Sequence, residues 1–191
     1  MKLVFATNNL NKLKEVQSLI PKHITLLSLK DIQCFEDIPE TQDTIEGNAI
    51  QKAEYIKNNY GYDCFADDTG LEVEALNNEP GVFSARYAGP QRDANDNMDL
   101  LLTNLKDKQN RNAQFKTVIA LHLNNNLQTF TSVCKGEITT ERHGEKGFGY
   151  DPIFKPKGYQ DTFAEMDLDL KNKIGHRGKA VKLLVDSLNK I

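Results

Sequence analysis

The sequence lacks the features that mark several classes of protein. No apolar run approaches the roughly 18 residues of a membrane helix, and the opening apolar stretch is too short for a secretory signal. The formal net charge is −3 at neutral pH, so overall charge gives no reason to expect nucleic acid or an acidic membrane as the main partner. Phosphate binding would instead require a local group of cations. We therefore expect a cytoplasmic protein with no nucleic-acid or membrane partner.

Cysteine is also scarce. Cys34, Cys64 and Cys134 are odd in number, far apart and without a C-x-x-C pair, which disfavours a disulfide framework or a zinc site and predicts three reduced thiols. The 191 residues are 39% hydrophobic and 27% charged, a balance typical of a soluble globular protein. No repeat, linker or low-complexity segment divides them. We predict a single α/β domain over residues 1–191.

Short apolar runs alternate with helical patterns along the chain. Lys2 to Ala6 predicts a buried strand, and the next segments predict a turn, a helix and a second strand. This order is the usual beginning of an α/β sheet. The later expected elements are a helix opened by Asp43 and Glu46, strands at 63–66 and 71–76, a turn at 77–78, a helix at 93–105, strands around 115–123 and 127–133 with a hairpin turn at 124–126, a glycine loop at 144–149 and a helix at 176–189.

The first candidate site segment is Thr7-Asn8-Asn9-Leu10-Asn11-Lys12, between the first strand and the first helix. Unpaired N–H groups and the positive end of a helix dipole suit phosphate at such a place. Lys12 adds a mobile positive charge, although no Walker A pattern is present. The alternative is an Asx turn that simply caps the helix, and this segment taken alone favours that alternative.

Carboxylates occur in two segments. Asp67 and Asp68 stand in Ala66-Asp67-Asp68-Thr69-Gly70, and adjacent side chains on an extended chain point to opposite sides. One carboxylate is therefore expected to bind a hard cation while the other orients a backbone or helix end, unless the segment is a solvated turn. The acidic loop with Glu36, Asp37 and Glu40 contributes to a magnesium site only if it faces Asp68; otherwise it is solvated.

Two later segments carry rings and cations. In Gly147-Phe148-Gly149-Tyr150-Asp151-Pro152 a large ring between glycines is placed to stack on a base; aromatics that fill a surface groove are the alternative. In Gly175-His176-Arg177-Gly178 two cations stand at a helix start, where the dipole favours negative charge. Reading the carbonyl edge of a base would explain them. A solvated Arg177 with a capping His176 is the alternative.

These segments together resemble the inosine triphosphate pyrophosphatase family, from Leu3 to near the C-terminus. Each motif is weak alone, but all of them in one order are specific. The matching motifs are T-N-N-x-x-K, I-P-E-T, A-D-D-T-G-L-E-V, P-G-V-F-S-A-R-Y, K-G-F-G-Y-D-P-I-F and H-R-G.

The resemblance implies an elongated mixed β-sheet flanked by helices, with two lobes and a central cleft, in a homodimer. It implies Mg²⁺-dependent hydrolysis of non-canonical purine nucleoside triphosphates (ITP, dITP, XTP) to the monophosphate and pyrophosphate. By motif, Asp68 would bind Mg²⁺ and accept the proton of the attacking water, and Glu40 would be the further metal ligand. The substrate-binding residues implied are Thr7, Asn8, Asn9, Leu10, Asn11 and Lys12 for the triphosphate, Thr69, and, for the nucleoside, Phe148, Gly149, Tyr150, Asp151, Lys171, His176 and Arg177.

The sequence departs from the family pattern at several positions. Asn8 replaces a usual glycine, and asparagine tolerates left-handed backbone angles; Thr69 replaces a serine and keeps the hydroxyl. Gln42 and Gly47 replace a glycine and a glutamate, which leaves Glu46 as a possible extra acid. Two other functions stay open: a pyrimidine-directed pyrophosphatase of related fold, and a nucleotide-binding regulatory module without catalysis.

Overall fold

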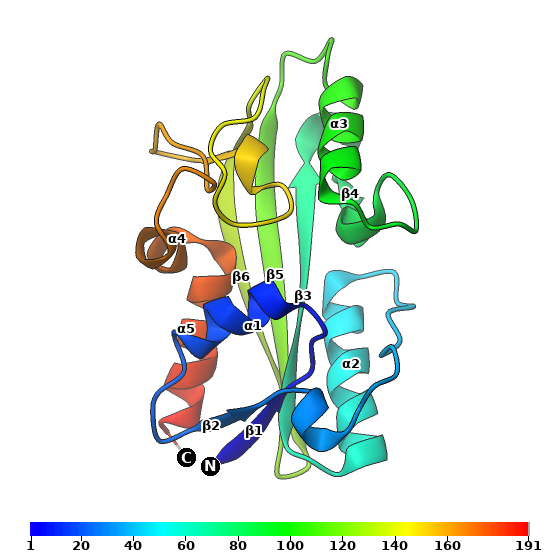
Figure 1. Ribbon diagram of the computed structural model, residues 1–191, viewed down its shortest axis with the longest axis vertical. Coiled ribbons are helices and arrows are strands. Elements are labelled where there is room, and N and C mark those ends of the chain that lie inside the picture. Colours follow the sequence, from blue (N-terminus) through cyan, green and yellow to red (C-terminus); the bar gives the residue numbers. More distant parts are fainter. Residues whose placement is uncertain (191) are drawn as a thin grey trace. The chain divides into compact units, whose positions relative to one another are not determined.

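A mixed seven-stranded sheet organises the chain, in the order β2-β1-β3-β5-β6-β7 with β4 paired to β3 (Figure 1). The computed structural model describes residues 1–190. β1 pairs in parallel with β2 and β3, whereas β4 and β7 are antiparallel to their neighbours β3 and β6. The strands are β1 (Lys2–Phe5), β2 (Thr25–Leu27), β3 (Cys64–Val73), β4 (Glu79–Gly81), β5 (Asn112–Leu123), β6 (Asn126–Ile138) and β7 (Phe154–Pro156). The predicted mixed sheet with flanking helices is confirmed, while the predicted cleft stays a prediction.

The helix predicted at 93–105 is confirmed as α3 (Ala94–Asn104), and the one predicted cap is shifted. Asp93 caps α3 by accepting bonds from two backbone N–H groups. The helix expected to open at Asp43 is instead capped by Thr44, whose hydroxyl accepts the Gly47 N–H at 2.9 Å. The helices are α1 (Leu10–Gln17), α2 (Ile45–Tyr60), α3 (Ala94–Asn104), α4 (Leu168–Ile174) and α5 (His176–Leu188); α4 was not predicted.

The chain divides into two compact units, which we call unit 1 (residues 1–68, 117–132 and 177–190) and unit 2 (residues 69–116 and 133–176). In unit 1, apolar residues of α1 and α5 pack with strands β1, β3 and β5 in one buried cluster. Phe5 and Phe65 stack at its centre with ring centroids 4.6 Å apart. This core fixes the end of β1 and the first part of β3, next to the first two candidate segments.

Unit 2 has a buried cluster of its own. Leucines of α3 pack there with apolar residues of its strand segments and of the chain between β6 and α4. Phe115, Phe154 and Phe163 form an aromatic group, with the first two ring centroids 4.7 Å apart. This aromatic core supports the loop that carries Phe148 to Asp151.

The strand around Asp67 differs from the prediction. We expected a strand to end at Asp67 and another to run from 71 to 76, but β3 is continuous through both aspartates and gives way to a 3-10 turn at Glu74–Leu76. Pairing of its first residues with β1 and of its last with β4 holds the segment extended, so sheet hydrogen bonds outweigh its turn-forming composition. The strand therefore directs Asp67 and Asp68 to opposite sides.

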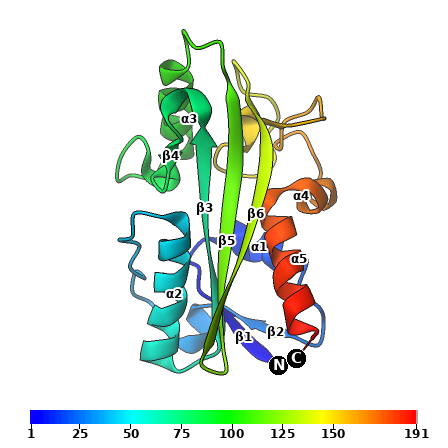
Figure 2. The ribbon, with the colours of Figure 1, turned by 180° about the vertical axis from the view of Figure 1, so that it is seen from behind.

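The asparagine hairpin is confirmed. β5 ends at Leu123 and β6 begins at Asn126, and Asn124 and Asn125 both have positive φ, at 49° and 61°. Such angles suit a two-residue turn, and asparagine accepts them. Figure 2 shows β5 and β6 running side by side into this turn.

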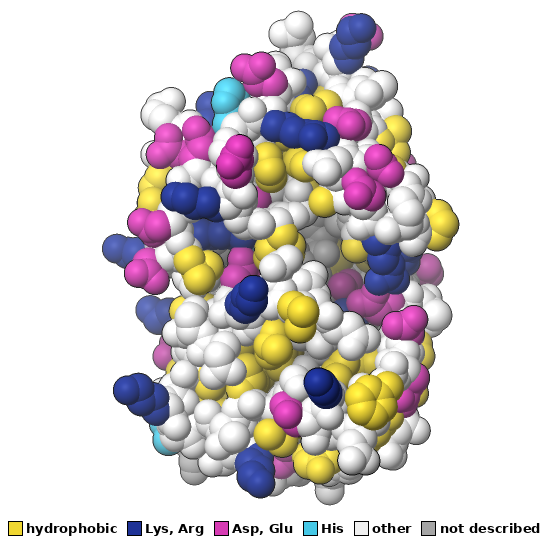
Figure 3. All heavy atoms as spheres, in the orientation of Figure 1, with side chains coloured by type: hydrophobic (Ala, Val, Ile, Leu, Met, Phe, Trp, Pro, Cys, Tyr) yellow, Lys and Arg dark blue, Asp and Glu magenta, His cyan; other side chains and the backbone are white. Residues whose placement is uncertain are grey.

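Basic and acidic side chains are interspersed on the face shown in Figure 3, in keeping with the small net charge. Among residues 1–190, none of the helices has the length and apolar character that a membrane span requires.

Candidate functional site

The segment Thr7 to Lys12 forms an Asx cap on α1. The Asn9 carboxamide oxygen accepts the backbone N–H groups of Asn11, at 3.0 Å, and Lys12, at 3.2 Å, while the Asn9 N–H donates to the Thr7 hydroxyl. Asn8 is not among the non-glycine residues of positive φ in the described chain, so its tolerance for left-handed angles is not used. The cap thus engages two of the helix N–H groups predicted to bind phosphate.

Asp67 joins this segment to the last helix within unit 1. Its carboxylate, 1% exposed, accepts the Lys12 ammonium at 3.0 Å and Arg177 Nε at 3.1 Å. Arg177 also binds Glu15 of α1 at 2.5 Å. Arg177 is only 4% exposed, so the alternative of a solvated arginine is wrong. We call Lys12, Asp67, Arg177 and Glu15 the buried charge network.

Asp68 points to the other side of β3, toward α2 and the acidic loop. Lys52 of α2 donates to Glu40 at 2.5 Å and to Asp68 at 3.4 Å. The Asn48 amide also donates to Asp68 at 3.4 Å. Within the acidic loop, Glu40 therefore faces Asp68. Glu36 instead accepts hydrogen bonds from Tyr55 and Tyr60.

Burial and neighbouring charges separate the two aspartates electrostatically. Burial opposes the charged form of Asp67, but Lys12 and Arg177 outweigh it and hold the pKa of this carboxyl well below its usual range. Burial raises the pKa of Asp68, although Lys52 and Lys12 act against the rise. Two adjacent carboxyls whose environments shift their pKa values in opposite directions are suited to different tasks. Asp67 is held as an anion, whereas burial favours the protonated form of Asp68.

The donor set at Asp68 fits a hard cation. Glu40 and Asp68 converge on one ammonium group, so both carboxylates lie within reach of a common point. Burial alone would lower the pKa of Lys52, but Asp68 and Glu40 raise it overall, which shows how strongly this place favours positive charge. No group of three or more His, Cys, Asp or Glu side chains within residues 1–190 has a metal-binding arrangement. Magnesium commonly takes one or two carboxylates and completes its shell with water and substrate.

In unit 2, Asp151 organises the glycine loop. Its Oδ2 accepts the Phe148 N–H at 2.8 Å and the Lys171 ammonium at 2.7 Å. Lys171 lies over the half-buried Phe148 ring, 4.9 Å from its centroid. Gly147 has φ +74°, and a Cβ there would stand 2.0 Å from the Asp151 carboxylate. The glycine is required for this loop, which joins three of the predicted nucleoside-binding residues.

Tyr150 and His176 belong to the core of unit 2. Tyr150 is 5% exposed and donates its hydroxyl to the Ser84 carbonyl at 2.7 Å. His176 is 4% exposed and stacks on Phe115, with centroids 4.4 Å apart. Gly149 and Thr69 are partly buried. The contacts of Tyr150 and His176 position the chain around Phe148 and Arg177; their predicted contacts with substrate stay predictions.

Sequence reasoning missed three residues of these clusters. Lys52 and Asn48 lie inside α2, and Glu15 lies inside α1; all three are buried polar residues. The signal that could have found Lys52 and Asn48 is their position beside the apolar stripe of α2, one residue before Ala53 and Ala49. A polar residue that borders an apolar stripe is a candidate for burial with a partner.

Comparison with known proteins identifies the family. A family model described as Ham1 family matches residues 3–187. A protein of Flavobacterium johnsoniae named dITP/XTP pyrophosphatase is 64% identical over 188 residues, covering 98% of both chains. The solved Ham1 protein structures of Coxiella burnetii and Staphylococcus aureus superpose with TM-scores of 0.92 and 0.91 at 38% and 36% identity, covering all of this chain and 100% and 99% of theirs. The chain belongs to the Ham1 family.

Proposed function

We propose that this chain hydrolyses non-canonical purine nucleoside triphosphates such as ITP, dITP and XTP between the α and β phosphates, releasing a nucleoside monophosphate and pyrophosphate. The printed name of the 64% identical relative supports the substrate class. The observation that carries the proposal is the convergence of Glu40 and Asp68 on Lys52, with Lys12 held by Asp67 on the other side of β3. Carboxylates beside cations are what a metal-assisted reaction on a polyphosphate requires.

The proposed cofactor is Mg²⁺, held by Glu40 and Asp68. Both are oxygen ligands, which hard divalent cations prefer. A bound divalent ion would neutralise phosphate charge and lower the pKa of the attacking water. Lys52 contacts both carboxylates and balances their charge in the absence of a cation.

Asp68 is the proposed general base. A carboxylate at its reference pKa of about 3.9 is a weak base, and burial raises the pKa of Asp68. A divalent ion on the same carboxylate would counteract this rise, so the proposed metal would assist proton transfer chiefly by lowering the pKa of the attacking water. Asp67 holds the Lys12 side chain at 3.0 Å and counteracts the lowering of its pKa by burial, so the ammonium is oriented before substrate arrives.

We propose that Arg177 and the loop around Phe148 both contribute to the selection of purines. Phe148 offers a ring on which a base can stack. Hypoxanthine and xanthine carry a carbonyl at C6 where adenine carries an amino donor, so a donor-lined site discriminates between them. Arg177 is bound to Asp67 and Glu15; its effect on selectivity is tested with Arg177→Lys, which retains the charge.

The experiment is a product assay with ITP, dITP, XTP, ATP, GTP, dUTP and dCTP in the presence of Mg²⁺. We expect pyrophosphate from ITP, dITP and XTP, and Asp68→Asn should abolish it without loss of fold. Asp37→Asn is the matched control, because Asp37 is an exposed acid of the loop that carries Glu40. Preference for dUTP or dCTP would favour the pyrimidine-directed alternative. Saturable ITP binding without pyrophosphate would favour the non-catalytic regulatory module.

We also propose a homodimer in the cytoplasm, with no nucleic-acid or membrane partner. The homodimer and the location rest on the resemblance and the composition given above. Light scattering at micromolar concentration should give twice the chain mass of 21.6 kDa; a monomer at that concentration would contradict it.

A further inference from the structure

Asn48 connects the acidic loop to Asp68. Its side chain is 1% exposed, its Oδ1 accepts the Gln42 N–H at 2.9 Å, and its Nδ2 donates to Asp68 at 3.4 Å. The orientation of the amide is unambiguous, because an N–H group can be accepted only by the oxygen, which leaves the NH₂ for the carboxylate. One buried amide therefore links the backbone two residues after Glu40 to the carboxylate of Asp68.

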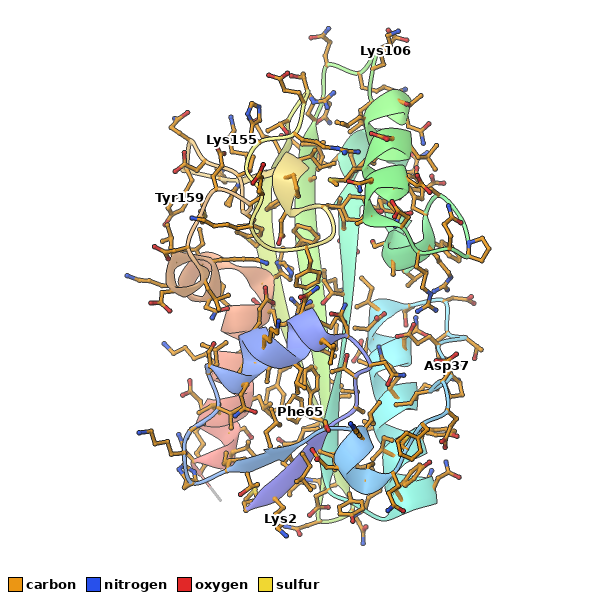
Figure 4. The ribbon with its side chains drawn as sticks, viewed as in Figure 1. Lys2, Asp37, Phe65, Lys106, Lys155 and Tyr159 are labelled. Atoms are coloured by element: carbon orange, nitrogen blue, oxygen red, sulfur yellow. The ribbon has the colours of Figure 1, made fainter. Side chains whose placement is uncertain are left out.

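The same face of α2 holds the rest of the loop. Gln51 and Thr41 exchange two hydrogen bonds, each 2.9 Å long. Lys52 binds Glu40, and Tyr55 donates to Glu36 at 3.1 Å. Asp37, labelled in Figure 4, marks this loop beside α2. Positions 48, 51, 52 and 55 follow helical spacing on a single face, so α2 acts as a template for the loop.

We propose that Asn48 is a positioning residue that sets the spacing of Glu40 and Asp68 before a divalent cation binds. Residues that orient metal ligands through hydrogen bonds commonly change metal affinity by about 10- to 100-fold when removed. When the ligands are already ordered, cation binding does not have to supply the free energy of ordering them. Of the links between loop and helix, Asn48 alone contacts both the loop backbone and Asp68 through hydrogen bonds given above. The inference rests on the proposed function, since it gives a role in metal binding to the same carboxylates.

Asn97 in α3 supplies a matched control. It stands four residues after its helix cap, Asp93, as Asn48 stands four residues after Thr44. Asn97 is 4% exposed, accepts the Ala88 N–H at 2.7 Å and donates to the Ala85 carbonyl at 3.1 Å. It too fastens the preceding chain segment to a helix, but it contacts neither candidate metal ligand.

The experiment compares Asn48→Ala with Asn97→Ala in the full-length protein. Mn²⁺ binding is measured by electron paramagnetic resonance without nucleotide, together with the Mg²⁺ dependence of ITP hydrolysis and the thermal unfolding of each variant. We expect both variants to lose stability. Only Asn48→Ala should weaken Mn²⁺ binding and raise the Mg²⁺ concentration for half-maximal rate, each by about 10-fold or more, with kcat largely recovered at saturating Mg²⁺. Asn48→Ser serves if Asn48→Ala does not fold.

The outcomes separate the inference from the proposed function. Unchanged Mn²⁺ binding in a folded Asn48 variant, or equal weakening in the Asn97 variant, overturns the positioning role. If the wild-type protein binds Mn²⁺ but releases no pyrophosphate, the proposed function fails. Weaker Mn²⁺ binding by the Asn48 variant alone then still supports the positioning role. Wild-type protein that binds no Mn²⁺ without nucleotide but releases pyrophosphate from ITP overturns the positioning role and leaves the proposed function standing.

Discussion

Replacing Asp67 by asparagine keeps the shape of the side chain and removes the negative charge that Lys12 and Arg177 share. Both contacts are short, 3.0 and 3.1 Å, and the carboxylate is 1% exposed. The Asp67→Asn variant therefore leaves the partly buried Lys12 and the buried Arg177 with Glu15 as the remaining carboxylate of the network. We therefore expect the main effect of Asp67→Asn to be a lower free energy of unfolding.

The expected cost follows from the burial of the network. Removing one partner of a buried ion pair costs about 3–5 kcal/mol, because the other charge is left without compensation. For a chain of this length each kcal/mol lowers Tm by about 2–4 °C, so the shift should be about 6–20 °C. Against a total stability of about 5–15 kcal/mol this is a large loss.

Urea unfolding followed by circular dichroism measures the loss, with Asp99→Asn as the matched control. Asp99 binds Arg142 at 2.6 Å, but the side chains of this pair are 71% and 37% exposed. An exposed pair contributes at most about 1 kcal/mol. Equal losses in the two variants would refute the assignment of Asp67 as a structural anion. As a second check, Asp67→Asn combined with Lys12→Met should cost less than the sum of the single variants.

Two further predictions concern packing and thiol chemistry. Gly47→Ala should destabilise the protein by about 1–3 kcal/mol in urea unfolding, since its Cβ would lie 2.8 Å from Gln42 Cβ and 2.9 Å from the Thr44 hydroxyl. Gln42→Gly should recover part of that loss, and no recovery would contradict the packing argument. The native protein should react slowly with a thiol reagent at pH 8, because all three cysteines are buried and the pKa of Cys64 is raised to about 12. In urea all three thiols should react with the reagent. A fast reaction of Cys64 in the native protein would contradict its burial.

Local patterns predicted the parts of the fold that local chemistry controls. The paired asparagines gave the β5–β6 turn because their backbone angles are intrinsic to the residue type. The apolar pattern of residues 93–105 predicted α3, and its start lies where the Asp93 side chain bonds its own neighbours. The alternation of an extended chain placed Asp67 and Asp68 on opposite sides, with partners on each side.

Long-range partners were beyond such reasoning. The predicted turn at Asp67 to Gly70 failed because pairing with β1 and β4, which local composition does not encode, keeps the segment extended. Arg177 lies 110 residues from Asp67 and 162 from Glu15, so no spacing rule connects them. Asn48 is an ordinary polar residue of a helix until the acidic loop is placed against it.

The central claim, attack of water at the α phosphorus of a purine triphosphate, is tested most directly by hydrolysing ITP in oxygen-18 water with Mg²⁺. Phosphorus NMR and mass spectrometry of the products locate the label. The account predicts IMP that carries the label and pyrophosphate that does not. Label in pyrophosphate or orthophosphate, or IDP among the products, would contradict it.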